Sequence, residues 1–310
     1  MSLARQLLLA ASTNAWLRQR ATNARFVRRS LSAFMPGERV EDALAAASQQ
    51  QAQRIGTILT RLGENVTRAE DAEEVTQHYL DVLDQVAAAG LDAQISVKPT
   101  QLGLDLDAEL CYRNLQRLVE RAEARRNFVW IDMESSPYVG STLDLFRRTR
   151  ARSPLVGVAL QAYLYRTAAD IEALLPLGSA IRLVKGAYLE PPDVAYPKKA
   201  DVDENFYTAA CRLLGDDAQR CGTLLHIATH DPRLVARLNA VIEARRVPHS
   251  AYEYAMLYGI QRALQLRLAK EGRRIRVLVA YGEYWFSWYM RRLAERPANV
   301  WFVAKNLFAR

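Results

Sequence analysis

The apolar residues of this chain follow two alternating patterns from residue 57 onward. Short apolar runs, several of them rich in β-branched residues, indicate buried strands, and longer segments with helical apolar spacing indicate helices. The strands are predicted at residues 57–62, 94–98, 128–133, 156–161, 180–185, 224–229, 250–257 and 276–280. Helices are predicted between them at residues 69–89, 108–126, 141–152, 167–175, 203–220, 232–245 and 258–270, and a final aromatic helix ends before Pro297.

This regular alternation of strands and helices predicts a parallel sheet built from βα units. Eight such units without a glycine-rich dinucleotide-binding motif favour a closed (β/α)8 TIM barrel over a doubly wound sheet. We expect the α/β barrel to span residues 56–310. Residues 1–55 are predicted to form a helical N-terminal arm with a break at Pro36 and Gly37. The arm is interpreted as a helical cap, with a membrane-surface or partner-binding face as the alternative.

The composition narrows the class of protein. The chain has 310 residues, of which 50% are hydrophobic, and this is enough for one large domain. No apolar run approaches the length of a membrane span, so we expect a soluble protein. Three widely spaced cysteines, Cys111, Cys211 and Cys221, fit a reducing cytoplasm. The net charge of +8 is spread along the chain, which argues against nucleic-acid binding.

Polar residues occur at the carboxyl ends of most predicted strands, which is where (β/α)8 barrels carry their active sites. They are Lys98, Asp132, Glu134, Gln161, Arg182, Lys185, His226, Thr229 and His230. Any one of them alone is well explained as an ordinary hydrogen-bonded group. Their repeated occurrence at one end of a barrel favours a functional face.

Cations outnumber carboxylates on this predicted face, which indicates a site for an anion. Two adjacent arginines, Arg291 and Arg292, follow a segment rich in aromatic residues on the final helix. Two guanidinium groups can bind a carboxylate or phosphate bidentately, although an isolated pair of arginines is usually a solvated patch. The sequence has no motif for a catalytic metal and no nucleophile beside a base. Redox chemistry with a bound organic cofactor fits best.

Seven segments carry a resemblance to a known family. They are SVKPTQLGLD, DMESS, LQAYLYRT, RLVKGAYLEP, ATHDP, EYAMLYG and YMRRLAER, and in this order they resemble bacterial monofunctional proline dehydrogenases. The resemblance implies a distorted barrel with its eighth helix over the mouth and a non-covalently bound FAD. It also implies oxidation of L-proline to Δ1-pyrroline-5-carboxylate by hydride transfer to FAD N5, the first step of proline catabolism to glutamate. Electrons would pass to a quinone, and a separate pyrroline-5-carboxylate dehydrogenase would act on the product.

The same resemblance implies roles for individual residues. Asp132 beneath the site and Arg182 beside the flavin are expected to act in catalysis. The residues expected to bind the substrate carboxylate and ring, or to support those that do, are Lys98, Tyr188, Leu257, Leu278, Arg291, Arg292 and Glu295. The residues expected to bind FAD are Met133 through its backbone, Gln161, Arg182, Val184, Lys185, Gly186, Ala187, Thr229 and His230.

Leu278 departs from the family pattern, which usually has a tyrosine there that packs against the proline ring. Loss of that ring and hydroxyl would leave space beside the substrate, so we expect weaker discrimination against hydroxyproline. Pro99 is a second, milder departure.

Three alternatives stay open at this point. They are oxidation of hydroxyproline or another cyclic amino acid, a flavin barrel similar to methylenetetrahydrofolate reductase, and a non-catalytic binding module. For localisation, we expect the cytoplasm, with peripheral contact at the inner face of the cell membrane as an open alternative.

Overall fold

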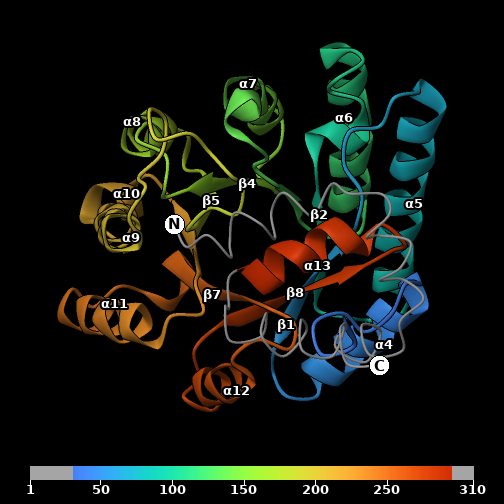
Figure 1. Ribbon diagram of the computed structural model, residues 1–310. Helices are drawn as coiled ribbons and strands as arrows, with labels where there is room; N and C mark the ends of the chain where they lie inside the picture. The colour runs from blue at the N-terminus through green and yellow to red at the C-terminus, as the bar shows by residue number, and fades with distance from the viewer. Residues whose placement is uncertain (1–30, 295–310) are drawn as a thin grey trace, which may run out of the picture.

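A closed barrel of eight parallel strands forms the centre of the protein, as the sequence predicts (Figure 1). The computed structural model describes residues 31–294. The strands are β1 (Gly56–Arg61), β2 (Ala93–Val97), β3 (Val129–Ile131), β4 (Val156–Gln161), β5 (Ala180–Val184), β6 (Leu224–Ala228), β7 (Tyr252–Leu257) and β8 (Ile275–Tyr281). β1 pairs with β8 in parallel and closes the barrel.

The helices form a ring around the strands (Figure 1). They are α5 (Ala69–Ala88), α6 (Ala108–Ala124), α7 (Val139–Arg150), α8 (Thr167–Leu174), α9 (Lys199–Leu213), α10 (Asp216–Arg220), α11 (Pro232–Ala244) and α12 (Arg262–Lys270). The single helix predicted at residues 203–220 is wrong, because the chain forms α9 and α10 there. The backbone leaves the helix after Leu213, and Gly215 is extended with φ −75° and ψ 163°. Glycine is a poor helix former, so the break falls beside it.

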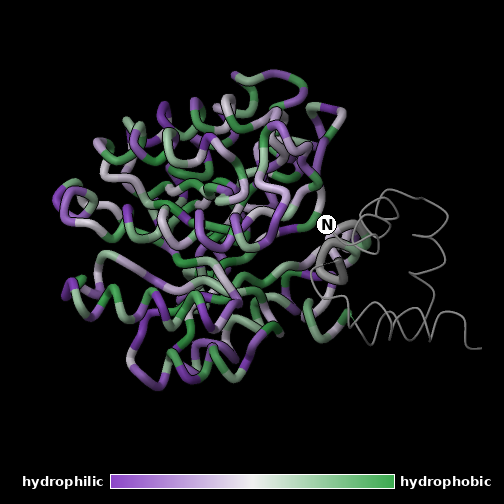
Figure 2. Tube along the Cα trace, turned by 60° about the vertical axis from the view of Figure 1, so that its left-hand side comes forward, coloured by the Kyte–Doolittle hydropathy of each residue, from purple (hydrophilic) through white to green (hydrophobic). Residues whose placement is uncertain are grey.

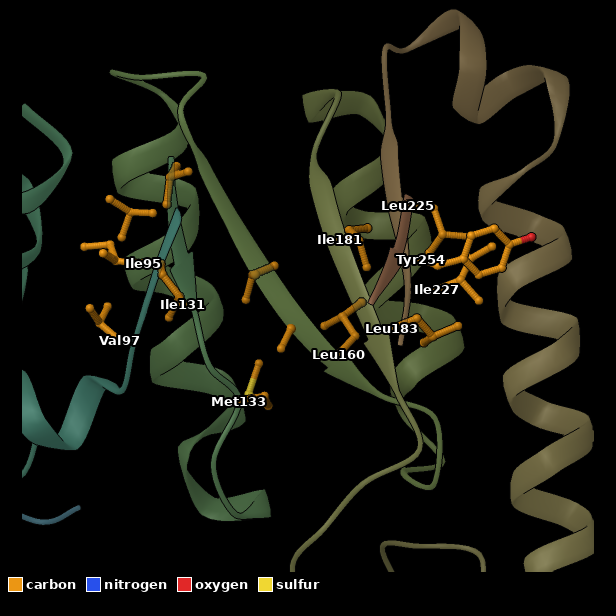
Figure 3. Packing of buried hydrophobic residues seen from close by; sticks show 14 of the residues in the cluster. Ile95, Val97, Ile131, Met133, Leu160, Ile181, Leu183, Leu225, Ile227 and Tyr254 are labelled. Atoms are coloured by element: carbon orange, nitrogen blue, oxygen red, sulfur yellow. The ribbon is translucent and has the colours of Figure 1, made fainter. Parts of the chain in front are cut away.

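The barrel wall is apolar on its outer face, where side chains of the strands meet the surrounding helices. Alternate strand residues point to opposite faces, so each strand contributes every second residue to this layer. Figure 3 shows part of the layer, with Ile95, Val97, Ile131, Met133, Leu160, Ile181, Leu183, Leu225, Ile227 and Tyr254 labelled. Hydrophobic positions accordingly concentrate in the centre of the molecule, and hydrophilic positions lie on the outer surfaces of the helices (Figure 2).

The seam between β8 and β1 is covered by a helix that precedes the barrel in the sequence. This helix is α4 (Val40–Gln51), whose buried Ala43, Ala46 and Ala47 join the main hydrophobic cluster. In a regular barrel the helix after the eighth strand would complete the outer ring. Here α13 (Trp285–Ala294) instead crosses in front of β8 and β1, as expected for an eighth helix over the mouth (Figure 1).

Residues just before α4 hold α13 in this position. Leu31 and Met35 share a hydrophobic cluster with the aromatic side chains of α13 and with Leu62 at the end of β1. The indole Nε1 of Trp285 donates a hydrogen bond of 3.0 Å to Glu38. The described part of the predicted arm therefore contacts both the barrel wall and the helix above its mouth, whereas residues 1–30 lie outside the described residues.

A network of buried charges fills the amino-terminal end of the barrel. Arg276 of β8 lies 3.2 Å from Glu253 of β7 and 2.7 Å from Asp92, which precedes β2. Glu253 also lies 3.1 Å from Nε2 of the fully buried His226. This contact places His226 at the barrel floor and not at the mouth, and burial lowers its pKa to about 4. Burial alone would raise the pKa of Glu253, but the His226 hydrogen bond and the Arg276 charge lower it to about 2.

The first prediction concerns this network. Arg276→Met should lower the free energy of unfolding by about 3–5 kcal/mol, because it leaves buried Glu253 without its main cation. Urea denaturation measures the change, and Arg147→Met on the surface of α7 is the control, with an expected change below about 0.5 kcal/mol. Equal changes in the two variants would contradict a structural role for the floor network.

Candidate active site

Three charged side chains from β2, β3 and β5 meet inside the barrel. Lys98 follows β2, Asp132 follows β3 and Arg182 lies in β5, and all three occupy inward-facing positions. The Lys98 Nζ lies 3.4 Å from Asp132, and the Arg182 Nη2 is hydrogen-bonded to the other carboxylate oxygen of Asp132. Ser96 of β2 completes the cluster, because its hydroxyl donates to Asp132 at 2.9 Å and accepts from Arg182 at 2.8 Å.

The charges in this cluster stabilise one another. Burial alone would raise the pKa of Asp132, but Arg182 and Lys98 hold it below its ordinary value. Burial alone would lower the pKa of Lys98, but Asp132 and other nearby acids raise it. Asp132 therefore stays a carboxylate and Lys98 stays an ammonium near neutral pH. The ammonium of Lys98 cannot accept a proton, and its two cationic neighbours make Asp132 a weak base.

Two buried polar atoms beside the cluster have no hydrogen-bond partner within residues 31–294. They are the Nη1 donor of Arg182 and the Oε1 acceptor of Gln161. The other end of the Gln161 amide donates to the backbone oxygens of Met133 at 3.3 Å and Glu134 at 3.1 Å, which fixes the direction of Oε1. Buried polar atoms are normally paired, so these two indicate a bound ligand with both an acceptor and a donor. A flavin ring has such groups along one edge, and the residues present fit it.

Lys185 points away from the charged cluster. It follows Val184 at the end of β5, and its Nζ lies 2.5 Å from Asp203 of α9 and 3.3 Å from Asp231. Its outward direction follows from strand alternation, since Arg182 three positions earlier faces inward. A cofactor contact by Lys185 would thus be made at the outer edge of the mouth, where these two carboxylates also lie.

Gly186 has a structural reason to be glycine. Its φ of +113° lies in the region that side chains rarely adopt, and a Cβ there would lie 2.4 Å from the ring of Tyr163. In the structure the space is taken by Tyr163 of the β4 loop, so close packing of two loops explains the glycine.

The loop after β5 extends across the mouth toward the loop after β1. The Tyr188 hydroxyl donates to Glu64 at 3.2 Å. A cavity of about 560 Å³ lies between the β1 loop, α5 and α13, lined in part by Glu64, Lys98, Gln101, Tyr284 and Trp288. The cavity gives the Lys98 ammonium access to a small polar ligand. Glu64 and Trp288 were not among the predicted site residues, although Trp288 precedes Arg291 by one helical turn.

The remaining predicted residues lie on β5 to β8 and on the loops that follow these strands. Leu257 donates its backbone N–H to His230 Nε2 at 3.4 Å, and the hydroxyl of Thr229 accepts from the backbone of Asp231 at 3.2 Å. Val184 and Ala187 are partly buried on β5 and its loop. Leu278 of β8 packs both against the floor cluster around Trp130 and against the cluster beneath α13.

The predicted arginine clamp is only partly covered by the described residues. Arg291 and Arg292 lie in α13, the helix that crosses the mouth, and their side chains are outside the described part of the structure. Glu295 also lies outside it. Both arginines therefore lie on the helix that was expected over the mouth, and the contacts of their side chains stay a prediction.

The fold and the site together define a class of protein, a (β/α)8 barrel with a buried cationic cluster and unpaired polar groups at its mouth. Comparison with known proteins narrows the class. A family model described as "Proline dehydrogenase" matches residues 43–305. The chain therefore belongs to the proline dehydrogenase family, whose members are flavin-dependent oxidoreductases, and the family expected from the sequence motifs is confirmed.

Individual relatives agree with this assignment. The chain is 36% identical over 307 residues to "Proline dehydrogenase 2" of Bacillus subtilis subsp. natto, with 99% of both sequences covered. It is 36% identical over 279 residues to the "Proline dehydrogenase" of Deinococcus radiodurans, with 88% of both covered.

Solved structures of proline utilization A (PutA) share the fold. That of Bdellovibrio bacteriovorus, inactivated by N-propargylglycine, superimposes with a TM-score of 0.79 at 22% identity over 86% of this chain. A mutant of the Bradyrhizobium japonicum protein gives a TM-score of 0.74 at 26% identity over 88% of this chain. The chain spans only about a third of the length of these proteins, with 32% and 31% of each covered.

A further carboxylate is buried behind Asp132. Glu134 accepts hydrogen bonds from the Thr100 hydroxyl at 2.6 Å and the Thr100 backbone N–H at 3.0 Å. Burial raises its pKa from 4.5 to about 7, although the Thr100 bonds oppose the shift. Because Thr100 lies two residues after Lys98, this contact ties the β2 loop to the β3 loop.

The second prediction concerns the pH dependence that Glu134 introduces. A raised carboxyl pKa contributes stability that is fully present below pH 4.5 and is lost as the pH rises to about 7. Glu134→Gln should therefore gain stability relative to the wild type over that range, by up to about 3 kcal/mol. Urea denaturation at several pH values measures it, with the exposed Glu120→Gln on α6 as control. A difference that stays constant with pH would contradict burial of the charge as its cause.

Proposed function

We propose that this protein oxidises L-proline to Δ1-pyrroline-5-carboxylate at the barrel mouth, with non-covalently bound FAD as hydride acceptor. One observation carries the proposal: Asp132 holds two buried cations, Lys98 after β2 and Arg182 in β5, and Arg182 Nη1 keeps an unused donor within the described residues. Such a cluster suits an anionic amino acid lying against a ring with hydrogen-bond acceptors.

The residues proposed to hold FAD lie on the side of the mouth formed by β3 to β6. Gln161 and Arg182 would bind the flavin ring through their unpaired atoms, together with the backbone at Met133. The remaining contacts are proposed for Val184, Lys185, Gly186, Ala187, Thr229 and His230. When bound, FAD supplies the acceptor for the hydride from proline C5, at its N5 atom.

The residues proposed to hold proline lie on the opposite side, beneath α13. Arg291 and Arg292 would bind the carboxylate, Lys98 would add a third positive charge, and Glu295 would pair with an arginine of the clamp. Tyr188 and Leu257 would enclose the ring next to Leu278. The cavity lined by Lys98, Tyr284 and Trp288 supports a ligand position between Lys98 and α13.

The cations also favour the reactive form of the substrate. Proline is a zwitterion near neutral pH, and its nitrogen must lose a proton before a hydride can leave C5. Positive charges near an ammonium lower its pKa, so the clamp and Lys98 favour the neutral amine. Asp132 contributes indirectly, because it keeps Lys98 and Arg182 in place, and Arg182 would stabilise negative charge that develops on the cofactor.

The later steps follow from the same proposal. Electrons would pass to a quinone at the membrane, and a separate pyrroline-5-carboxylate dehydrogenase would use the product. Among residues 31–294, no helix combines the length and apolar character needed to span a bilayer. Contact with the inner face of the cell membrane would then be peripheral.

The test of the proposed function is optical. Purified protein should be yellow, and L-proline under anaerobic conditions should bleach the flavin absorbance. A yellow protein that proline does not bleach would favour another substrate or a reductase similar to methylenetetrahydrofolate reductase. A protein that stays colourless after addition of FAD would favour a non-catalytic binding module.

The proposed arginine clamp leads to the third prediction. Arg292→Lys should raise the KM for proline about tenfold or more, since an ammonium cannot reproduce the two parallel hydrogen bonds of a guanidinium. Steady-state kinetics measures the effect, and Arg147→Lys on the surface of α7 should leave KM unchanged. An unchanged KM in Arg292→Lys would remove that residue from the clamp.

Leu278 leads to the fourth prediction, which concerns selectivity. Leu278→Tyr should increase the preference for proline over hydroxyproline, because the added ring and hydroxyl fill space beside the substrate. The measurement is the ratio of kcat/KM for the two substrates, and one lost or gained contact of this size changes such ratios by roughly tenfold or more. Identical ratios in the variant and the wild type would show that position 278 does not set selectivity.

A further inference from the structure

The indole of Trp130 lies inside the barrel next to Arg182. Trp130 lies in β3, two residues before Asp132, and strand alternation therefore turns both side chains toward the interior. Its side chain is fully buried, and the guanidinium carbon of Arg182 lies 5.2 Å from its ring centre. This distance is within the range of a cation–π contact, and tryptophan provides the strongest such contact among the aromatic residues.

The ring is held in place from several directions. Its Nε1 donates a 2.7 Å hydrogen bond to Gln94 of β2, and the neutral ring of His226 lies 4.2 Å from it, centre to centre. Gly157 is its register partner in β4, and a Cβ there would lie 2.6 Å from Cζ3 of the indole. The barrel therefore makes room for this ring and leaves it little freedom to move.

Two kinds of contact together determine the orientation of the Arg182 guanidinium. Ser96 and Asp132 hold the Nη2 end at one point. These two acceptors fix the Nη2 end, and the face of Trp130 limits displacement of the guanidinium out of its plane. The Nη1 donor then has one direction, in which it meets no partner among the described residues. It is the donor that the proposed function assigns to the flavin.

We infer that Trp130 is a positioning residue that orients Arg182 Nη1 toward the flavin and thereby stabilises the reduced cofactor relative to the oxidised one. The inference rests on the proposed function, since it requires a bound flavin. Trp130 acts through Arg182 and makes no contact with the substrate. Replacing the ring should therefore change the midpoint potential of the flavin more than it changes the KM for proline.

The experiment compares the flavin midpoint potential of the holoenzyme in three proteins: wild type, Trp130→Leu and Trp130→Phe. Trp130→Leu should lose roughly tenfold in its preference for reduced over oxidised FAD, which lowers a two-electron potential by about 30 mV. Trp130→Phe keeps a weaker aromatic face and should shift less, in the same direction. The KM for proline should stay close to that of the wild type in both variants while kcat falls.

The matched control is Phe146→Leu, which removes a fully buried aromatic ring from the outer hydrophobic cluster on α7. It should lower stability without changing the potential. An unchanged potential in Trp130→Leu, or an equal shift in Phe146→Leu, would overturn the inference. If Trp130→Leu does not fold, Trp130→Phe decides, and an unchanged potential there has the same meaning.

Failure of the inference is distinguishable from failure of the proposed function. Wild-type protein that lacks flavin, or whose flavin proline does not bleach, would count against the proposed function. Wild-type protein that binds flavin and is bleached by proline, with unchanged potentials in the Trp130 variants, would count against the inference alone.

Discussion

The interaction on which the site depends is the bridge that Asp132 forms between Lys98 and Arg182. Two cations inside a barrel repel each other and lose their hydration, and one carboxylate between them offsets both costs only if the geometry is good. Ser96 supplies the extra hydrogen bonds that such a buried cluster needs. The bridge also uses only part of Arg182, since Nη1 meets no partner in the described part of the chain and can bind a ligand.

The charged cluster is separated from a second one at the other end of the barrel. The floor network of Arg276, Glu253 and His226 closes the amino-terminal end, and Trp130 lies between it and the mouth. Because the two clusters are separate, the barrel interior can stabilise the fold at its floor and bind a ligand at its mouth. The floor network consists of contacts among its own charged groups, and at the mouth Arg182 Nη1 and Gln161 Oε1 have no partner among residues 31–294.

The position of α13 depends on α4, which takes the place in the outer ring that the helix after the last strand would otherwise fill. Because α4 covers the seam between β8 and β1, the helix after the last strand is not required there and lies across the mouth (Figure 1). The segment before α4 then holds α13 through Trp285 and the aromatic cluster. A helix that carries two arginines is thereby kept near the strand ends by residues more than two hundred positions earlier in the sequence.

Much of the fold and part of the site could be predicted from the sequence. The alternation of apolar runs and helical segments was enough to predict eight strands and to place Lys98, Asp132 and Gln161 at their ends, since each apolar run has a clear limit.

This pattern was less informative where a polar residue lies in the middle of an apolar run. His226 was grouped with the mouth, but it bonds with Glu253 at the floor, a partner 27 positions later in the sequence. Trp130 and Glu64 are not among the predicted site residues, because a buried tryptophan or a loop glutamate has no local sequence pattern that separates a site residue from an ordinary one.

The sequence by itself determined the parallel barrel, the polar strand ends and the family, because these depend on periodicity and on short motifs that local chemistry specifies. Only the tertiary structure decided which charges meet. Lys98 and Arg182 share Asp132, whereas Lys185 turns outward to Asp203 and Asp231. The physical reason is that an ion pair depends on distances across the barrel, and strand register and helix placement set those distances only when the whole chain has folded.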